Sequence, residues 1–136
     1  YRSIHYKKLC KLWQKYDWKP CPKDSLPKVG YVVEHEDKIV AAGFLYLTST
    51  NMSLLEWVIG DKDADKDIRS EAVDKLIEQL CERAVIEKSS LVYLVTKTDV
   101  LIERYKKHGF HVMETGATTM IKTLDTNLST EFLEDD

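Results

Sequence analysis

Residues 54–85 read LLEWVIGDKDADKDIRSEAVDKLIEQLCERAV, and this stretch decides the fold. Its first part, Leu54–Ile59, is a short apolar run that predicts a β-strand. From Ile68 onward the apolar residues recur at intervals of three and four. That spacing predicts a long amphipathic helix that continues to about Lys88.

The residues on either side of this helix complete a β–α–β unit. Asp65 or Asp67 is the predicted N-cap, because a short carboxylate accepts hydrogen bonds from the free N–H groups of the first turn. A second apolar run, Leu91–Val95, predicts another strand. Because such crossovers are right-handed, the strands 54–59 and 91–95 are expected to be parallel neighbours. A ligand cleft is expected where their carboxyl ends diverge.

The segments before this unit predict a helix and two antiparallel strands. Ser3–Tyr16 has apolar residues at helical spacing and a lysine-rich outer face, and a proline-containing loop follows over 17–28. A strand begins near Gly30 and a short turn leads to the strand Ile39–Thr48. Because Ile39–Thr48 is apolar on both faces, it is expected to lie in the centre of the sheet.

The segments after the unit predict a helix over Asp99–His108 and a hairpin formed by Phe110–Met113 and Thr118–Lys122. Residues 1–124 are therefore interpreted as a single domain, and residues 125–136 as an acidic, flexible tail. The predicted fold class is α/β (α+β), with a mixed, mostly antiparallel sheet of six to seven strands, helices on both faces and a splayed parallel pair in the middle.

Composition excludes several functional classes. The chain has 136 residues, 43% of them hydrophobic and 32% charged, with a net charge of −3. That balance is typical of a globular domain and does not favour binding to nucleic acid. The longest apolar run has about eight residues, whereas a membrane-spanning helix needs about 20, so no membrane partner is expected. The three cysteines, Cys10, Cys21 and Cys81, are read as reduced thiols of a cytoplasmic protein.

A metal site is not expected either. Asp61, Asp63 and Asp65 have the spacing of the first ligands of an EF-hand loop, but Lys66 stands where that loop needs glycine and Ala72 where it needs glutamate. Nor do the histidines and cysteines have zinc-site spacing. The aspartates are interpreted as a solvated loop at a helix N-terminus.

The segment Leu101–Phe110, LIERYKKHGF, resembles the LYEKLGF signature of the GNAT superfamily of N-acetyltransferases. The family's tyrosine matches Tyr105 and its Gly-Phe pair matches Gly109-Phe110. Its usual asparagine, seven residues before the tyrosine, is Thr98 here. Together with the order of the elements, the resemblance extends over most of the chain and implies a GNAT-like fold.

The resemblance implies that acetyl-CoA is the acetyl donor and that an amine of a small molecule or peptide is the acceptor. It places the pantetheine arm in the gap between the parallel strands, against the main chain of Trp57, Val58 and Ile59. The pyrophosphate would be held at the start of the following helix, where the cofactor-binding set comprises Lys66, Ile68, Arg69 and Ser70, with Thr98 across the gap. The family's glycine-rich phosphate loop is not kept, because Asp65, Asp67 and Arg69 stand where small residues are usual.

Two residues are candidates for catalysis by direct attack of the amine on the thioester. The resemblance gives Tyr105 the role of an acid that protonates the departing thiolate. Glu56, on the strand beside the cleft, is the candidate base that takes the proton of the acceptor, and Glu34 is a second candidate. The altered loop favours an alternative function, a catalytically inactive GNAT-fold module for binding or regulation. A monomer or a homodimer is expected.

Overall fold

The computed structural model describes residues 1–124, in which one mixed sheet has the strand order β1-β2-β3-β4. The strands are β1 (Gly30–His35), β2 (Lys38–Leu47), β3 (Met52–Gly60) and β4 (Leu91–Tyr93). β1 and β3 both pair antiparallel with β2. β2 is buried along most of its length, which confirms that it is a central strand covered on both faces.

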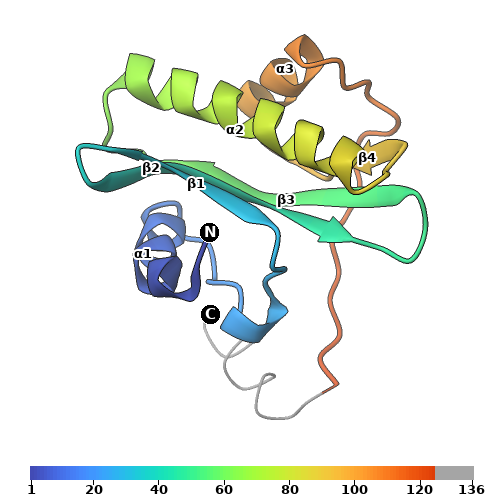
Figure 1. Ribbon diagram of the computed structural model, residues 1–136, viewed down its shortest axis with the longest axis horizontal. Coiled ribbons are helices and arrows are strands. Elements are labelled where there is room, and N and C mark those ends of the chain that lie inside the picture. Colours follow the sequence, from blue (N-terminus) through green and yellow to red (C-terminus); the bar gives the residue numbers. More distant parts are fainter. Residues whose placement is uncertain (125–136) are drawn as a thin grey trace.

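Helices cover both faces of this sheet (Figure 1). On one face lie α2 (Lys66–Ile86) and α3 (Asp99–Lys107), and on the other lies α1 (Tyr6–Lys15) with two short 3-10 turns, η1 (Ser3–His5) and η2 (Lys23–Ser25). Each face has its own core. The predicted apolar stripe of α2 packs on the sheet through residues such as Leu76, Ile77 and Leu80, which are fully buried. On the opposite face, Leu9 and Trp13 of α1 pack against Phe44.

The parallel pair β3–β4 is present, as the crossover rule predicts. The register joins Met52 to Leu91, Ser53 to Val92 and Leu54 to Tyr93. The pairing stops there, although β3 runs on to Gly60. The two strands are therefore joined at their amino ends and separate toward their carboxyl ends. The side chains of Ser53 and Ser89 are hydrogen-bonded to each other near the joined end.

A β-bulge lies in β3 beyond the point where the strands separate. Across it, Phe44 and Ala42 of β2 are two residues apart, whereas their partners Glu56 and Ile59 are three apart. Trp57 takes up the extra residue with a φ of +60°, in the left-handed region that side chains rarely adopt. Bulges of this kind often re-aim side chains beside a binding site. The sequence did not reveal it, because Trp57 carries no glycine-like signal.

The structure departs from the predicted sheet at its far edge. The sheet over residues 1–124 has four strands, not six to seven, and the segments 110–113 and 118–122 form no strands. After α3 the chain runs past β4 from the α2 face to the α1 face (Figure 1). Its apolar side chains, including Met113 and Met120, are mostly exposed, so burial does not fix a strand there. The predicted tail, 125–136, lies outside the described residues.

Candidate active site

A cavity of about 320 Å³ lies where β3 and β4 separate. One wall is the bulged part of β3, and the opposite wall is the segment that follows β4. The start of α3 and parts of two loops close it. The lining residues are Glu56, Trp57, Val58, Val95, Thr96, Lys97, Thr98, Leu101, Tyr105, Trp18 and Thr119. The cavity is thus in the place where the sequence predicts a cleft.

Glu56 is a carboxylate inside this gap. It lies on β3 opposite Phe44, next to the bulge, and is partly buried. Burial raises the pKa of Glu56, and a backbone hydrogen bond from Val95 on the other wall opposes that rise. A carboxylate with a raised pKa is a better proton acceptor than an exposed one. The alternative base, Glu34, is exposed on β1 and does not line the cavity.

Tyr105 enters the cavity from α3. Its side chain is only 5% exposed and its ring packs against Phe110, with 5.2 Å between the ring centroids. Burial raises the pKa of Tyr105, and the negative charge of Glu56 raises it further. The phenol therefore stays protonated through the physiological range and holds a proton that it can donate. Tyr105 and Glu56, the two predicted catalytic residues, line the same cavity.

Polar contacts fasten α3 to α2 on either side of Tyr105. The guanidinium of Arg104 donates to the carbonyl and the hydroxyl of Ser70, each at 3.1 Å, and lies 3.0 Å from Asp74. His108 Nε2 lies 2.9 Å from the same Asp74 oxygen. Burial opposes ionisation of Asp74, but the bonds to His108 and Arg104 outweigh it and hold the pKa of Asp74 below its usual value. This cluster sets where α3 presents Tyr105.

Two tryptophans form the side of the cavity toward α1. The indole of Trp57 packs on Trp13 at 5.5 Å between ring centroids, and its Nε1 donates to Tyr46 Oη at 3.0 Å. The side chain of Trp57 therefore packs mainly in the core on the α1 face of the sheet. Trp18 comes from the proline-containing loop and lines the cavity. Sequence analysis missed Trp18, because nothing in that loop marks one residue as facing a ligand.

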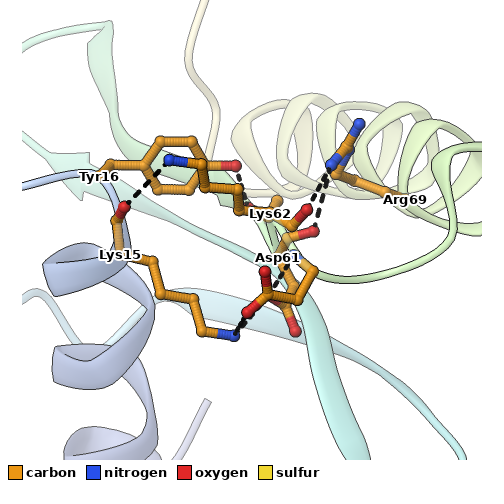
Figure 2. Close-up of polar contacts among 7 residues, drawn as sticks. Lys15, Tyr16, Asp61, Lys62 and Arg69 are labelled. Carbon is orange, nitrogen blue, oxygen red and sulfur yellow. Dashed lines mark hydrogen bonds and ion pairs between the residues drawn. The ribbon is translucent and has the colours of Figure 1, made fainter.

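Side-chain hydrogen bonds and ion pairs hold the loop between β3 and α2 in place (Figure 2). Asp65 is the N-cap of α2, and its carboxylate accepts from the N–H groups of Asp67 at 3.1 Å and Ile68 at 3.3 Å. One of the two predicted capping residues is thus confirmed. These are the N–H groups that a phosphate would use at a helix N-terminus.

Arg69 and Lys15 also bind within this loop (Figure 2). The guanidinium of Arg69 donates to the carbonyls of Asp61 at 3.4 Å and Lys62 at 3.1 Å. Its stem crosses Gly60, where a Cβ would lie only 2.8 Å from Arg69 Cγ. Lys15 of α1 lies 2.8 Å from Asp61 and 2.9 Å from Asp63. These two cationic groups are therefore bound to partners in the chain itself.

The structure brings together only part of the predicted cofactor-binding set. Trp57, Val58 and Thr98 line the cavity. Ile59 is 3% exposed and packs in the core below the sheet. The residues at the start of α2 do not line the cavity; they are Lys66, Ile68, Arg69 and Ser70.

Neither a metal nor a membrane is indicated by the part of the chain that the structure describes. Within residues 1–124, no group of three or more His, Cys, Asp or Glu side chains could hold a metal ion. No helix in the same range has the length and apolar character to cross a bilayer.

Comparison with known proteins identifies the fold. No protein-family model and no curated protein matches the sequence. Among solved structures, Rv2747 from Mycobacterium tuberculosis, in complex with CoA, is 19% identical with a TM-score of 0.69, over 98% of this chain and 85% of that one. The GNAT-family acetyltransferase SP0256 from Streptococcus pneumoniae is 18% identical, TM-score 0.65, over 86% and 89%. A soil metagenomic aminoglycoside acetyltransferase in complex with sisomicin is 14% identical, TM-score 0.64, over 90% of each chain. This chain has the fold of the GNAT acetyltransferases.

Proposed function

We propose that this protein is an N-acetyltransferase that moves an acetyl group from the thioester of acetyl-CoA to an amine. The observation that carries the proposal is the cavity in the β3–β4 gap, which is lined by a partly buried carboxylate, Glu56, and a buried phenol, Tyr105. The fold supports it, because the solved GNAT acetyltransferases share this arrangement of elements.

The gap suits the pantetheine end of the donor. Beyond the Leu54–Tyr93 pair the β4 side of β3 has no strand partner, and the bulge removes Trp57 and Val58 from the β2 register. Main-chain groups in such a position can hydrogen-bond an extended amide chain as a neighbouring strand would. When bound, acetyl-CoA would supply the acetyl thioester, and the overall change replaces a C–S bond with a C–N bond.

The chain's own residues would move the protons. Glu56 takes a proton from the ammonium group of the acceptor and so makes the nitrogen a nucleophile. The N–H of Val58 is the candidate donor to the carbonyl oxygen, where negative charge develops. Tyr105 gives its phenolic proton to the departing thiolate, and the second amine proton replaces it through solvent. Holding the amine and the thioester side by side in the cavity would supply much of the rate enhancement.

The acceptor would enter from the α1 side of the cavity. Trp18 offers a flat apolar surface there, and Thr119 adds a hydroxyl from the segment after α3. We propose a small-molecule or peptide amine as acceptor. Lys97 lines the same cavity and favours an acceptor that also carries a negative group.

The experiment is a screen with acetyl-CoA and amines of four classes: polyamines, aminoglycosides, amino acids and peptides with a free N-terminus. Release of free thiol measures turnover, and mass spectrometry identifies the acetylated product. We expect one class to be acetylated, and the Tyr105→Phe variant to lose that activity. Thermal shift is run in parallel, since a ligand at 100 times its Kd stabilises a protein by about 2.7 kcal/mol.

A non-catalytic binding module is the second candidate, and the closed loop before α2 favours it. The discriminating result is a protein that acetylates no amine and shows no thermal shift with millimolar acetyl-CoA. A thermal shift without turnover points to a module that binds the donor.

A further inference from the structure

Several N–H groups of the loop before α2 and of the first turn of α2 are already hydrogen-bonded. Asp65 Oδ2 accepts from two of them, those of Asp67 and Ile68, and the Asp65 carbonyl accepts from Arg69 N at 2.9 Å. Earlier in the loop, Asp63 N donates to Asp61 Oδ1 at 3.0 Å and Ala64 N to the Asp61 carbonyl at 3.1 Å. A diphosphate at this helix N-terminus would have to displace these bonds.

The charges of the loop act in the same direction. Residues 61–67 hold four aspartates and two lysines, so the loop is net negative. Burial opposes ionisation of Asp61, but the hydrogen bonds from Lys15 and from the N–H of Asp63, together with nearby positive charge, keep the pKa of Asp61 below its usual value. Asp61 therefore stays charged at neutral pH. The carboxylates of Asp65 and Asp67 would repel a dianionic ligand at the start of α2, and Lys15 and Arg69 already have partners within the chain.

The cavity lies elsewhere along β3. Its lining ends at Val58 on that strand, and no residue of 59–70 contributes to it. The cavity is the place that a thioester and its pantetheine arm would fill. A nucleotide diphosphate would reach the start of α2, which lies outside the cavity and where Asp65 already binds the N–H groups of Asp67 and Ile68.

We infer that the site recognises acyl donors through the pantetheine arm alone, so that its donor class is acyl-pantetheine thioesters, of which acetyl-CoA is one member. The diphosphate and nucleoside of CoA add no affinity here. This inference rests on the proposed function and deepens it. It also assigns Asp65 a role: its carboxylate occupies the diphosphate's place on α2.

The first experiment compares ligands on the unmodified protein. Isothermal titration calorimetry measures Kd for CoA and for pantetheine at low and at high salt. We expect the two values to agree within about three-fold, with no loss of CoA affinity in salt. Acetyl-CoA and acetyl-pantetheine should likewise have similar kcat/KM. CoA binding about 100-fold tighter than pantetheine, a difference typical of charge-assisted bonds to phosphate, would overturn the inference and leave the proposed function standing.

The second experiment opens the loop with a matched pair of variants. Asp65→Asn removes the charge and keeps a capping oxygen, whereas Asp65→Gly removes both and frees the two N–H groups. We expect Asp65→Gly to bind CoA at least about ten-fold more tightly than pantetheine, and Asp65→Asn to show a smaller preference. Pantetheine affinity should stay unchanged in both variants.

The remaining outcomes are decisive as well. If Asp65→Gly gains no preference for CoA and circular dichroism shows that it is folded, the role assigned to Asp65 is wrong. If it does not fold, the comparison of CoA and pantetheine on the unmodified protein still decides the inference. If neither ligand binds the unmodified protein, the proposed function fails, and the inference about its donor fails with it.

Discussion

The cavity between β3 and β4 and the loop between β3 and α2 are built in different ways. The gap between β3 and β4 is a feature of the main chain, because it results from a parallel pairing that ends early and from a bulge in β3. In the loop before α2, individual side chains decide, and Asp65, Arg69 and Lys15 close it. A fold therefore keeps a topological pocket more readily than a site made from a few loop residues. Substitutions in each region should show this difference.

The largest effect is expected in the cavity, for Tyr105→Phe. We expect kcat to fall by about 100-fold or more, because the proton donor is lost, while donor affinity stays unchanged. Removal of one hydroxyl should change the free energy of unfolding by less than about 1.5 kcal/mol. Steady-state kinetics and thermal denaturation measure both. Tyr93→Phe, at the sheet edge outside the cavity, is the control. An unchanged kcat in Tyr105→Phe would remove Tyr105 from the mechanism.

Glu56→Gln should give the next largest effect, with a distinctive pH dependence. We expect kcat at pH 7 to fall by about 10- to 100-fold and to recover in part at pH 9, where the amine arrives neutral. A pH–rate profile of the two proteins checks this. A loss of the same size at every pH would mean that Glu56 positions the acceptor and does not take its proton.

The same substitution also tests the burial of Glu56. A raised pKa means that protonation stabilises the folded state, so this contribution is present below the unfolded pKa and is lost as the pH rises through the folded pKa. Glu56→Gln should therefore have a higher Tm than the unmodified protein at pH 8 and the same Tm near pH 4. A lower Tm at pH 8 would show that the charged form is the stabilised one.

Arg104→Ala tests the attachment of the helix that carries Tyr105. It removes the bonds from α3 to Ser70 and Asp74, and the Arg104 side chain is 19% exposed. We expect a loss of about 1–3 kcal/mol in the free energy of unfolding, and a fall in kcat larger than the change in KM. Urea denaturation and kinetics measure these. Lys107→Ala, in the last turn of the same helix, is the control.

The smallest effect is expected in the loop before α2. Asp65→Ala should cost about 0.5–2 kcal/mol of stability through loss of the N-cap, and Asp65→Asn much less. Denaturant titration of the pair separates the cap from the charge. If Asp65→Ala is as stable as the unmodified protein, the Asp65 side chain does not hold this loop in place, and the contrast between the loop and the gap would be lost.

Much of this architecture follows from local sequence patterns. The three- and four-residue spacing from Ile68 predicts α2, and the apolar runs on either side of it predict the parallel pair. β2 could be placed in the centre because both of its faces are apolar. Glu56 could be placed at the cleft because the crossover rule sets β3 beside β4, whereas Tyr105 was assigned from the resemblance of its segment to the GNAT signature.

What the sequence did not predict depends on tertiary contacts. The segments 110–113 and 118–122 flank a glycine-containing turn and read as a hairpin, but a strand also needs a covered face, and Met113 and Met120 are exposed. Trp18 and Thr119 line the cavity from irregular segments, where no periodicity shows the direction of a side chain. The loop could be seen to be acidic, but its internal hydrogen bonds depend on the backbone path that Asp61 and Asp65 follow.

The extra residue in β3 has a consequence for how such a protein can change. The bulge shifts the alternation of side chains, so that Leu55 and Val58 lie in one core while Trp57 and Ile59 lie in the other. Deletion of a single residue at Trp57 would restore an even strand, and the ladder with β4 could then lengthen toward Gly60. One short genetic deletion would thus reshape the pocket at the expense of a ring that packs on Trp13, whereas a substitution that keeps the extra residue would leave the bulge in place.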